Sequence, residues 1–394
     1  MKALLLRDIR LPDGTAADVL IEDGSFTAFG CNLTAPPGAA VEDGQGGLLL
    51  PGLIEGHTHL DKTLWDMPWY RNECGPLLAE RIANERRQRG LLGLDPARQS
   101  KALADAFLAL GTTRIRSFAD IDTEIGLKHL HALLELRQAQ AGVQEIQVVA
   151  FPQSGLLVRP GTQDLLAQAM ADGADIVGGL DPSGIDRDPK GHLDAIFGLA
   201  ESTGKPLDIH LHEVGELGAF ALELIVERVL ALAMQGQVVV SHAFCLGDVA
   251  PARQAALLAL LAKAGIALAT TAPPSRNVPP VAACRAAGVT IFGGNDGIRD
   301  TWTPYGAPDM LQRAMILGLK NDFRRDDQIE VALDCVTGTA ARGCGFADHG
   351  LAVGMLAEAV LLDAQSVAEA VVAQPPRRLV ISGGRVVARD GILV

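Results

Sequence analysis

The chain has 394 residues, of which 48% are hydrophobic and 21% are charged, a balance typical of a globular protein with a large apolar core. Its 34 basic and 47 acidic side chains give a net charge of −13, which argues against nucleic acid or an anionic membrane as partner, because both attract basic surfaces. No apolar run reaches the roughly 18 residues of a transmembrane helix, and the first residues lack a signal peptide's apolar region, so we expect a cytoplasmic protein without a membrane span.

Both ends of the chain are predicted to form β structure. Short strand-like runs within residues 1–48 are separated by Pro-Asp-Gly, Glu-Asp-Gly and Pro-Pro-Gly, which mark tight turns. Residues 359–388 show the same pattern, and neither end holds enough apolar residues for a core of its own. We therefore expect residues 1–50 and 351–394 to pair into one small β-sandwich module.

Between these ends, eight β-rich runs alternate with helical patterns rich in Ala and Leu. The runs are 48–54, 113–118, 146–150, 175–179, 207–211, 238–240, 266–270 and 289–293. Eight β–α units in series predict a parallel (β/α)8 barrel of the TIM type over residues 51–350, with a doubly wound open sheet as the alternative. The connection between residues 59 and 99 is longer than ordinary loops, so we expect it to contain a helix and to cover the barrel mouth.

Histidines gather where the predicted barrel strands end. His57 and His59 end the first strand, His210 lies near the end of the fifth, and Asp296 follows the eighth. The carboxyl ends of parallel barrel strands share one rim, where active sites lie, and side chains two positions apart on an extended chain point to the same side. Three imidazoles and one carboxylate suit Zn²⁺ or Fe²⁺ and leave one position for water. We assign His57, His59, His210 and Asp296 as ligands of one divalent metal ion.

The same rim supplies candidate catalytic residues. A bound divalent ion lowers the pKa of its water from about 15.7 to near 7 and so provides hydroxide at neutral pH. Asp296 can take the proton of this water. Glu213, three residues after His210, is placed to carry a proton to a ring nitrogen or a leaving group. His242, which follows the sixth strand, is placed to orient the water or the attacked oxygen.

Simpler interpretations exist for single members of this set. His59 alone could be an ordinary strand-end histidine, Glu213 a solvated surface carboxylate, and Asp296 a helix N-cap. Strict alternation would turn Glu213 away from the side that His210 faces, unless the strand stops just after His210. His212 is left open as a ligand, a pocket wall or a supporting residue.

The sequence resembles the amidohydrolase superfamily. The resemblance is carried by the segment from Pro51 to Lys62 with its His-Thr-His, by His210-x-x-Glu213, by Ser241-His242 and by Asn295-Asp296. Within the superfamily, the chain is most similar to the branch of cytosine deaminase and N-isopropylammelide isopropylaminohydrolase.

Three candidate substrate contacts accompany this resemblance. The segment ending in Phe151-Pro152-Gln153 is similar to the one whose glutamine contacts the substrate in cytosine deaminases, and the segment ending in Trp302 resembles their eighth-strand segment. We therefore expect Gln153 and Trp302 to bind substrate. Lys62, close to the metal pair, is either a third substrate contact or a solvated loop lysine.

The resemblance implies a barrel with a composite β module, a single catalytic metal, and hydrolytic removal of an amino or alkylamino group from a small nitrogen heterocycle. It also implies a homo-oligomer. Binuclear relatives carry a carboxylated lysine at the end of strand four, where this chain has Gly179-Leu180-Asp181, which favours one metal ion. Gly297 stands where cytosine deaminases have a second acid that helps recognise the pyrimidine amine, which argues against cytosine itself.

Two other functions stay open at this point. The same hydroxide could hydrolyse a ring bond of a cyclic amide or imide, and product analysis separates ring opening from amine release. The chain could instead be a non-catalytic metal-binding scaffold. Such a scaffold is expected to have lost one or more of the polar residues, and none is missing here.

Overall fold

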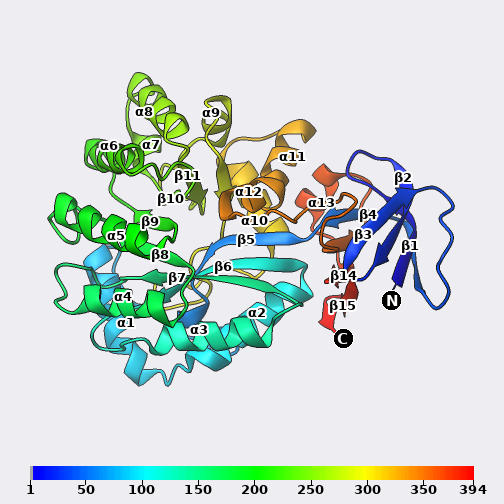
Figure 1. Cartoon of the computed structure of the whole chain (residues 1–394), viewed down its shortest axis with the longest axis horizontal. Coiled ribbons are helices and arrows are strands. Elements are labelled where there is room, and N and C mark those ends of the chain that lie inside the picture. Colours follow the sequence, from blue (N-terminus) through cyan, green and yellow to red (C-terminus); the bar gives the residue numbers. More distant parts are fainter. Residues whose placement is uncertain (1–2) are drawn as a thin grey trace.

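A computed structural model of the chain describes residues 3–394 and contains two eight-stranded sheets. One sheet is all parallel, with its strands in chain order from β5 to β12, and the other is a mixed sheet made from both chain ends. Figure 1 shows the parallel sheet surrounded by helices and the mixed sheet beside it, with both termini on the mixed sheet. The predicted barrel and its composite terminal module are confirmed.

The barrel strands are β5 (Leu53–Thr58), β6 (Thr112–Asp120), β7 (Glu145–Phe151), β8 (Ile176–Leu180), β9 (Leu207–Leu211), β10 (Val238–His242), β11 (Ala267–Thr270) and β12 (Ile291–Gly293). The helices are α1 (Leu78–Leu91), α2 (Pro96–Ala109), α3 (Lys128–Ala139), α4 (Thr162–Asp172), α5 (Pro189–Thr203), α6 (Gly215–Ala231), α7 (Cys245–Asp248), α8 (Pro251–Lys263), α9 (Val281–Ala286), α10 (Met310–Lys320), α11 (Asp326–Asp334), α12 (Gly338–Cys344) and α13 (Val367–Ala373). The module strands are β1 (Ala3–Arg10), β2 (Ala16–Glu22), β3 (Ser25–Gly30), β4 (Ala40–Pro51), β13 (Ala359–Leu362), β14 (Arg377–Ser382), β15 (Arg385–Arg389) and β16 (Ile392–Leu393).

Local sequence explains these elements. Strands β8, β9 and β10 are buried along their whole length, as expected for parallel strands covered on both faces. Helix α2 starts with Pro96 at its first position, and the side chain of Asp95 caps it by accepting a hydrogen bond from Ala97 N. Helix α5 starts in the same way, with Asp188 before Pro189.

The barrel closes between its first and last strands. Thr58 and Asp296 form a parallel bridge, and Asp296 N donates a hydrogen bond to His57 O at 2.8 Å. The open doubly wound alternative is therefore wrong. This closure also brings two of the predicted metal ligands together.

The first predicted barrel strand needs a correction at Gly52. Leu48, Leu49 and Leu50 belong to β4 and pair with β13 in the module, whereas the barrel strand starts at Leu53. A Cβ atom on Gly52 would lie 2.4 Å from Thr113 Oγ1, so only glycine fits where the chain passes between the sheets. One apolar run thus serves two sheets.

The module is one mixed sheet in the order β16-β15-β14-β13-β4-β1-β2-β3. Leu6 and Phe26 from the N-terminal strands share an apolar core with Leu361 and Ile381 from the C-terminal strands. Ala357 N, just before β13, donates to the carbonyl of Gly24 at 2.7 Å, so the sheet curls until its two halves touch. The domain boundaries at 50/51 and 350/351 stay a prediction.

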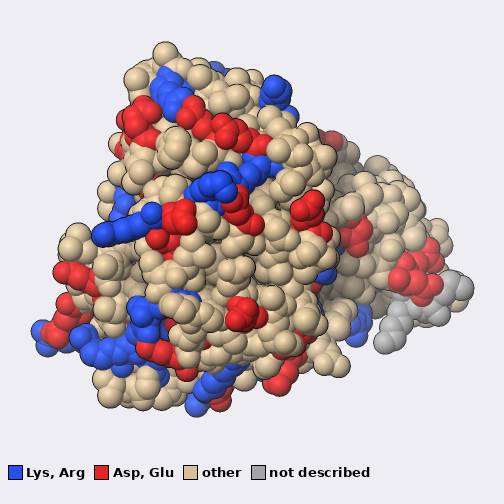
Figure 2. All heavy atoms as spheres, turned by 60° about the vertical axis from the view of Figure 1, so that its left-hand side comes forward, with Lys and Arg blue, Asp and Glu red and all other residues tan. Residues whose placement is uncertain are grey.

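Two surface features bear on partners. None of the helices among residues 3–394 is both long enough and apolar enough to cross a membrane. On the face that Figure 2 shows, the described basic side chains are interleaved with acidic ones.

We predict that Arg114 fastens the barrel to the C-terminal segment. Its fully buried guanidinium donates to Glu358 Oε2 and to Asp348 Oδ1, each at 2.7 Å. Because Arg114→Met leaves the buried Glu358 carboxylate unpaired, it should lower the free energy of unfolding by about 3–5 kcal/mol in urea titrations. The double variant Arg114→Met/Glu358→Leu should recover most of this loss, and equal losses in both variants would contradict the pairing.

Candidate active site

Four histidines meet at the carboxyl ends of the barrel strands. The ring centroid of His57 lies 4.6 Å from that of His210, 4.9 Å from that of His242 and 5.7 Å from that of His59. All four side chains are buried. The structure thus brings together the four strand-end histidines that the sequence singled out.

Asp296 completes the cluster from the loop after β12. Its Oδ1 atom lies 3.3 Å from His59 Nε2 and 3.8 Å from His57 Nε2. Metal–nitrogen bonds of about 2.0–2.1 Å at tetrahedral angles place two ligand atoms roughly 3.3 Å apart. Asp296 is therefore spaced as a ligand beside these imidazoles, although its side chain is half-exposed.

The unpaired nitrogen atoms of the cluster fit a cation. Among residues 3–394, no hydrogen-bond partner reaches His57 Nε2 or either ring nitrogen of His210 and His242, all of them buried. Such atoms are costly to bury unless a ligand satisfies them. Burial, assisted by the neighbouring imidazoles, holds the pKa of His57 and that of His210 well below their usual range. Both rings are neutral and offer lone pairs to a metal.

The four assigned ligands and His242 fall into two overlapping groups. His57, His59 and Asp296 form one, and His57, His210 and His242 form the other; within each group the ligand atoms lie within 4.8 Å of one another. His57 belongs to both. His242 is therefore placed where it could bind the metal ion as well as orient the water.

Glu213 is anchored by one oxygen and free at the other. Strand β9 ends at Leu211, so strict alternation no longer applies at Glu213. Its Oε1 accepts hydrogen bonds from Ser183 N at 2.7 Å and Gly184 N at 2.6 Å, while Oε2 is buried without a partner in the described chain. Burial raises the pKa of this carboxyl, so it can hold a proton. The interpretation of Glu213 as a solvated surface carboxylate is wrong.

His212 packs against His242 and supports its ring. The two rings stack with centroids 4.4 Å apart, and His212 Nδ1 lies 2.8 Å from Asp181 Oδ2. Asp181 follows β8, at the position where the sequence showed only that a lysine is absent. Its carboxylate orients the His212 ring.

Lys62 is buried in an ionic network rather than solvated. Its Nζ lies 2.5 Å from Gln153 Oε1, 3.3 Å from Asp120 Oδ1 and 3.4 Å from Glu85 Oε2. Because an ammonium group only donates, Gln153 turns its amide oxygen towards Lys62 and its NH₂ group away from it. Lys62 therefore fixes the orientation of Gln153, and the interpretation as a solvated loop lysine is wrong.

The long connection supplies its own helix, α1, as expected. Glu85 on α1 contacts Lys62 and accepts a hydrogen bond from Trp302 Nε1, so the helix reaches the loops after strands one and eight. Arg89, one turn further on, pairs with Glu85 and with Asp120 at the end of β6. The sequence did not single out Glu85 or Arg89, because charged residues in a helical pattern normally face solvent, nor did it single out Asp120 at the end of β6.

The carboxylate of Asp300 lies beside Gly297. A Cβ atom on Gly297 would lie 1.9 Å from Asp300 Oδ2, so the Asp300 side chain fills the space that a side chain at position 297 would need. Asp300 Oδ1 accepts hydrogen bonds from the backbone of Trp302 at 2.7 Å and Thr303 at 2.9 Å.

We expect Gly297→Asp to push Asp300 and the Trp302 loop out of place, and to lower kcat/KM by about 10–100-fold without loss of bound metal, because small misplacements of positioning residues are costly. Gly198→Asp on the outer helix α5 is the control, since a Cβ there meets nothing within 4 Å. Steady-state kinetics with metal analysis would check this. Equal kcat/KM in both variants would show that Asp300 does not hold the loop for catalysis.

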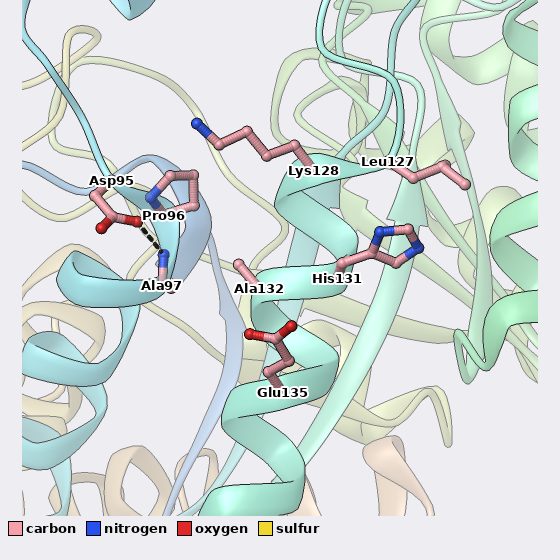
Figure 3. A pocket seen from close by; sticks show the side chains of 8 residues that line it. All are labelled: Asp95, Pro96, Ala97, Leu127, Lys128, His131, Ala132 and Glu135. Atoms are coloured by element: carbon pink, nitrogen blue, oxygen red, sulfur yellow. Dashed lines mark hydrogen bonds between the residues drawn. The ribbon is translucent and has the colours of Figure 1, made fainter.

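The groove in Figure 3 is separate from this site. It measures about 500 Å³ and is lined by residues of α3 and of the start of α2, among them Asp95, His131 and Glu135. None of the rim residues lines it. The groove lies on the outer wall of the barrel.

Comparisons with known proteins place these observations in context. The model of the amidohydrolase family matches residues 75–388. The crystal structure of N-isopropylammelide isopropylaminohydrolase from Burkholderia multivorans is 58% identical, with a TM-score of 0.98 and 100% of each chain covered. N-isopropylammelide isopropyl amidohydrolase from a Pseudomonas strain is 28% identical over 89% of each sequence. The structure of 5-methylcytosine deaminase from Klebsiella pneumoniae liganded with 5-fluorocytosine is 27% identical, with a TM-score of 0.86, and covers 98% of this chain and 97% of that one.

Proposed function

The chain belongs to the amidohydrolase family, and on that premise we propose that it removes an amino or alkylamino group from a small nitrogen heterocycle by hydrolysis. The observation that carries this proposal is the cluster of four buried histidines with Asp296, in which buried ring nitrogens have no hydrogen-bond partner among residues 3–394. The relative that is 58% identical favours an alkylamino-triazine of the N-isopropylammelide type.

We propose that His57, His59, His210 and Asp296 hold one divalent ion, Zn²⁺ or Fe²⁺. The neutral imidazoles and the spacing of Asp296 from His59 support this set. The absence of a lysine after β8 supports a single ion. When bound, such an ion lowers the pKa of a coordinated water to near 7 and thereby supplies a nucleophile at neutral pH.

The side chains at the rim then move the protons. The Asp296 carboxylate takes a proton from the attacking water and gives it to the departing amine. Glu213 Oε2 protonates the ring nitrogen next to the attacked carbon and takes up the remaining proton of the added hydroxyl when the carbon–nitrogen bond breaks, so that an oxo group is left beside a ring N–H. His242, supported by the His212 ring, donates a hydrogen bond to the oxygen that the ring carbon gains. The net reaction adds water, releases an amine and leaves an oxo group on the ring.

The pocket side chains orient the ring. The NH₂ group of Gln153, turned away from Lys62, offers donors to a ring carbonyl or a ring nitrogen. Trp302 provides an apolar wall, held by Glu85 from α1. In this role Lys62 acts through Gln153, and the arrangement suits a heterocycle with an acceptor atom beside the reacting carbon.

Metal analysis coupled to an amine-release screen tests the proposal. Purified protein would be incubated with N-isopropylammelide, its unsubstituted amino analogue, cytosine, isocytosine and creatinine, and ammonia and alkylamine would be scored separately. We expect about one metal per chain and release of isopropylamine. Ring opening without amine release would support the cyclic-amide alternative. A protein that binds metal after reconstitution but changes none of these compounds would support the metal-binding scaffold.

The cytoplasmic location stays a prediction from the sequence, and the homo-oligomeric state rests on the family resemblance alone.

A further inference from the structure

A chain of three buried side chains leads from His57 into the barrel interior. Ser241 Oγ lies 2.9 Å from His57 Nδ1 and 2.6 Å from Asp208 Oδ1. Asp208 Oδ2 in turn accepts a hydrogen bond from Arg116 Nη1 at 3.1 Å. Each of these four residues is at most 4% exposed. The proposed reaction gives no role to Ser241, Asp208 or Arg116.

The direction of each hydrogen bond follows from the chemistry of its partners. A guanidinium only donates and a carboxylate only accepts, so the single hydroxyl hydrogen of Ser241 points to Asp208. The oxygen of Ser241 can then only accept from His57, which places the ring hydrogen of His57 on Nδ1. A neutral imidazole carries one ring hydrogen, so Nε2 is left with a bare lone pair.

Nε2 is also the nitrogen that faces the candidate metal centre. It lies 3.8 Å from Asp296 Oδ1, and the described residues offer it no hydrogen-bond partner. We infer that Asp208, acting through Ser241, sets the tautomer of His57 and so keeps Nε2 free to bind a metal ion. Ser241 and Asp208 are positioning residues for a metal ligand. This inference rests on the metal centre of the proposed function.

The chain of hydrogen bonds from Arg116 through Asp208 and Ser241 to His57 is called the relay here. The strands that carry these residues hold the relay rigidly. Asp208 lies on β9 and Ser241 on β10, which are neighbouring strands in register. Arg116 on β6 is fixed by two further contacts, to Gln147 Oε1 at 3.0 Å and to the carbonyl of Cys344 at 3.0 Å. Arg116 therefore keeps an N–H group directed at Asp208. The atom of residue 208 that faces Arg116 must be an acceptor.

Asp208→Asn tests the direction of the relay. Arg116 still needs an acceptor, so the amide oxygen should face Arg116 and the amide NH₂ should face Ser241. Ser241 would then accept from Asn and donate to His57 Nδ1, which moves the ring hydrogen of His57 to Nε2.

Nitrogen-15 NMR of the metal-free protein, with the His57 signals assigned by their loss in His57→Gln, reads this tautomer directly. We expect Nδ1–H in the wild type and Nε2–H in Asp208→Asn. Competition with a chelator should show a loss of Zn²⁺ affinity of about 100-fold, the upper range for partners of metal ligands.

Variants at Ser241 decide the matter if Asp208→Asn does not fold. Ser241→Ala breaks the relay without reversing it and should lower Zn²⁺ affinity about 10-fold, whereas Ser241→Thr keeps a hydroxyl and should retain the affinity. Ser117→Ala is the matched control, because the buried Ser117 Oγ at the same rim accepts from Leu60 N and donates to the carbonyl of Phe118, and among the described residues it bonds no imidazole nitrogen.

Nε2–H in the wild type, or Zn²⁺ affinity within twofold of wild type in Ser241→Ala, would overturn the inference. If the wild-type protein has the ring hydrogen on His57 Nδ1 and binds Zn²⁺ but releases no amine, the proposed function is contradicted. The inference about Asp208 and Ser241 would not be affected by that result.

Discussion

Asp296→Asn is expected to lower kcat/KM by at least about 10³-fold, because it removes both a metal ligand and the acceptor of the water's proton. The carboxylate oxygen lies 3.3 Å from His59 Nε2, and a neutral amide in its place binds a cation more weakly and cannot take a proton. The measurement is steady-state amine release together with metal content per chain.

Saturating metal separates the two roles of Asp296. If the variant regains a full metal complement in excess Zn²⁺ but stays inactive, the lost proton acceptor accounts for the defect. Asp194→Asn, on the exposed surface of α5, is the control and should match wild type. Turnover within tenfold of wild type in Asp296→Asn would remove Asp296 from the mechanism.

Glu213→Gln is expected to lower kcat by about 10²–10⁴-fold with little change in stability or metal content. The amide oxygen of Gln can still accept from Ser183 N and Gly184 N, so only the proton at the free oxygen is lost.

The pH profile of Glu213→Gln gives a second readout. Burial raises the pKa of Glu213, and a general acid must be protonated, so wild-type kcat should fall as the pH rises through this raised pKa. The Gln variant should lack that decline. Glu216→Gln, on the exposed start of α6, serves as control, and a kcat within threefold of wild type in Glu213→Gln would show that another group delivers the proton.

Much of the barrel could be predicted because its elements have local signatures. The run 207–211 coincides with β9, and the run 146–150 lies within β7. The split at Gly52 could not be predicted, because an apolar run shows that a strand is buried but not which sheet buries it.

The metal ligands could be proposed because each lies near or just after the end of a predicted strand, and strand ends of a parallel barrel converge. The surroundings of those ligands could not. Ser241 meets Asp208 only through strand pairing, and Glu85 reaches Lys62 only because α1 folds over the rim. Burial of a charge is a property of the whole fold, so Lys62 could not be told from a solvated lysine in the sequence.

Turnover of N-isopropylammelide in H₂¹⁸O tests the proposed chemistry most directly. Mass spectrometry of the products should show a closed triazine ring with one ¹⁸O atom on the carbon that carried the amine, and one unlabelled isopropylamine for each ring. A ring-opened product, or a metal-loaded protein that releases no amine from this substrate, would contradict hydrolysis of an exocyclic carbon–nitrogen bond.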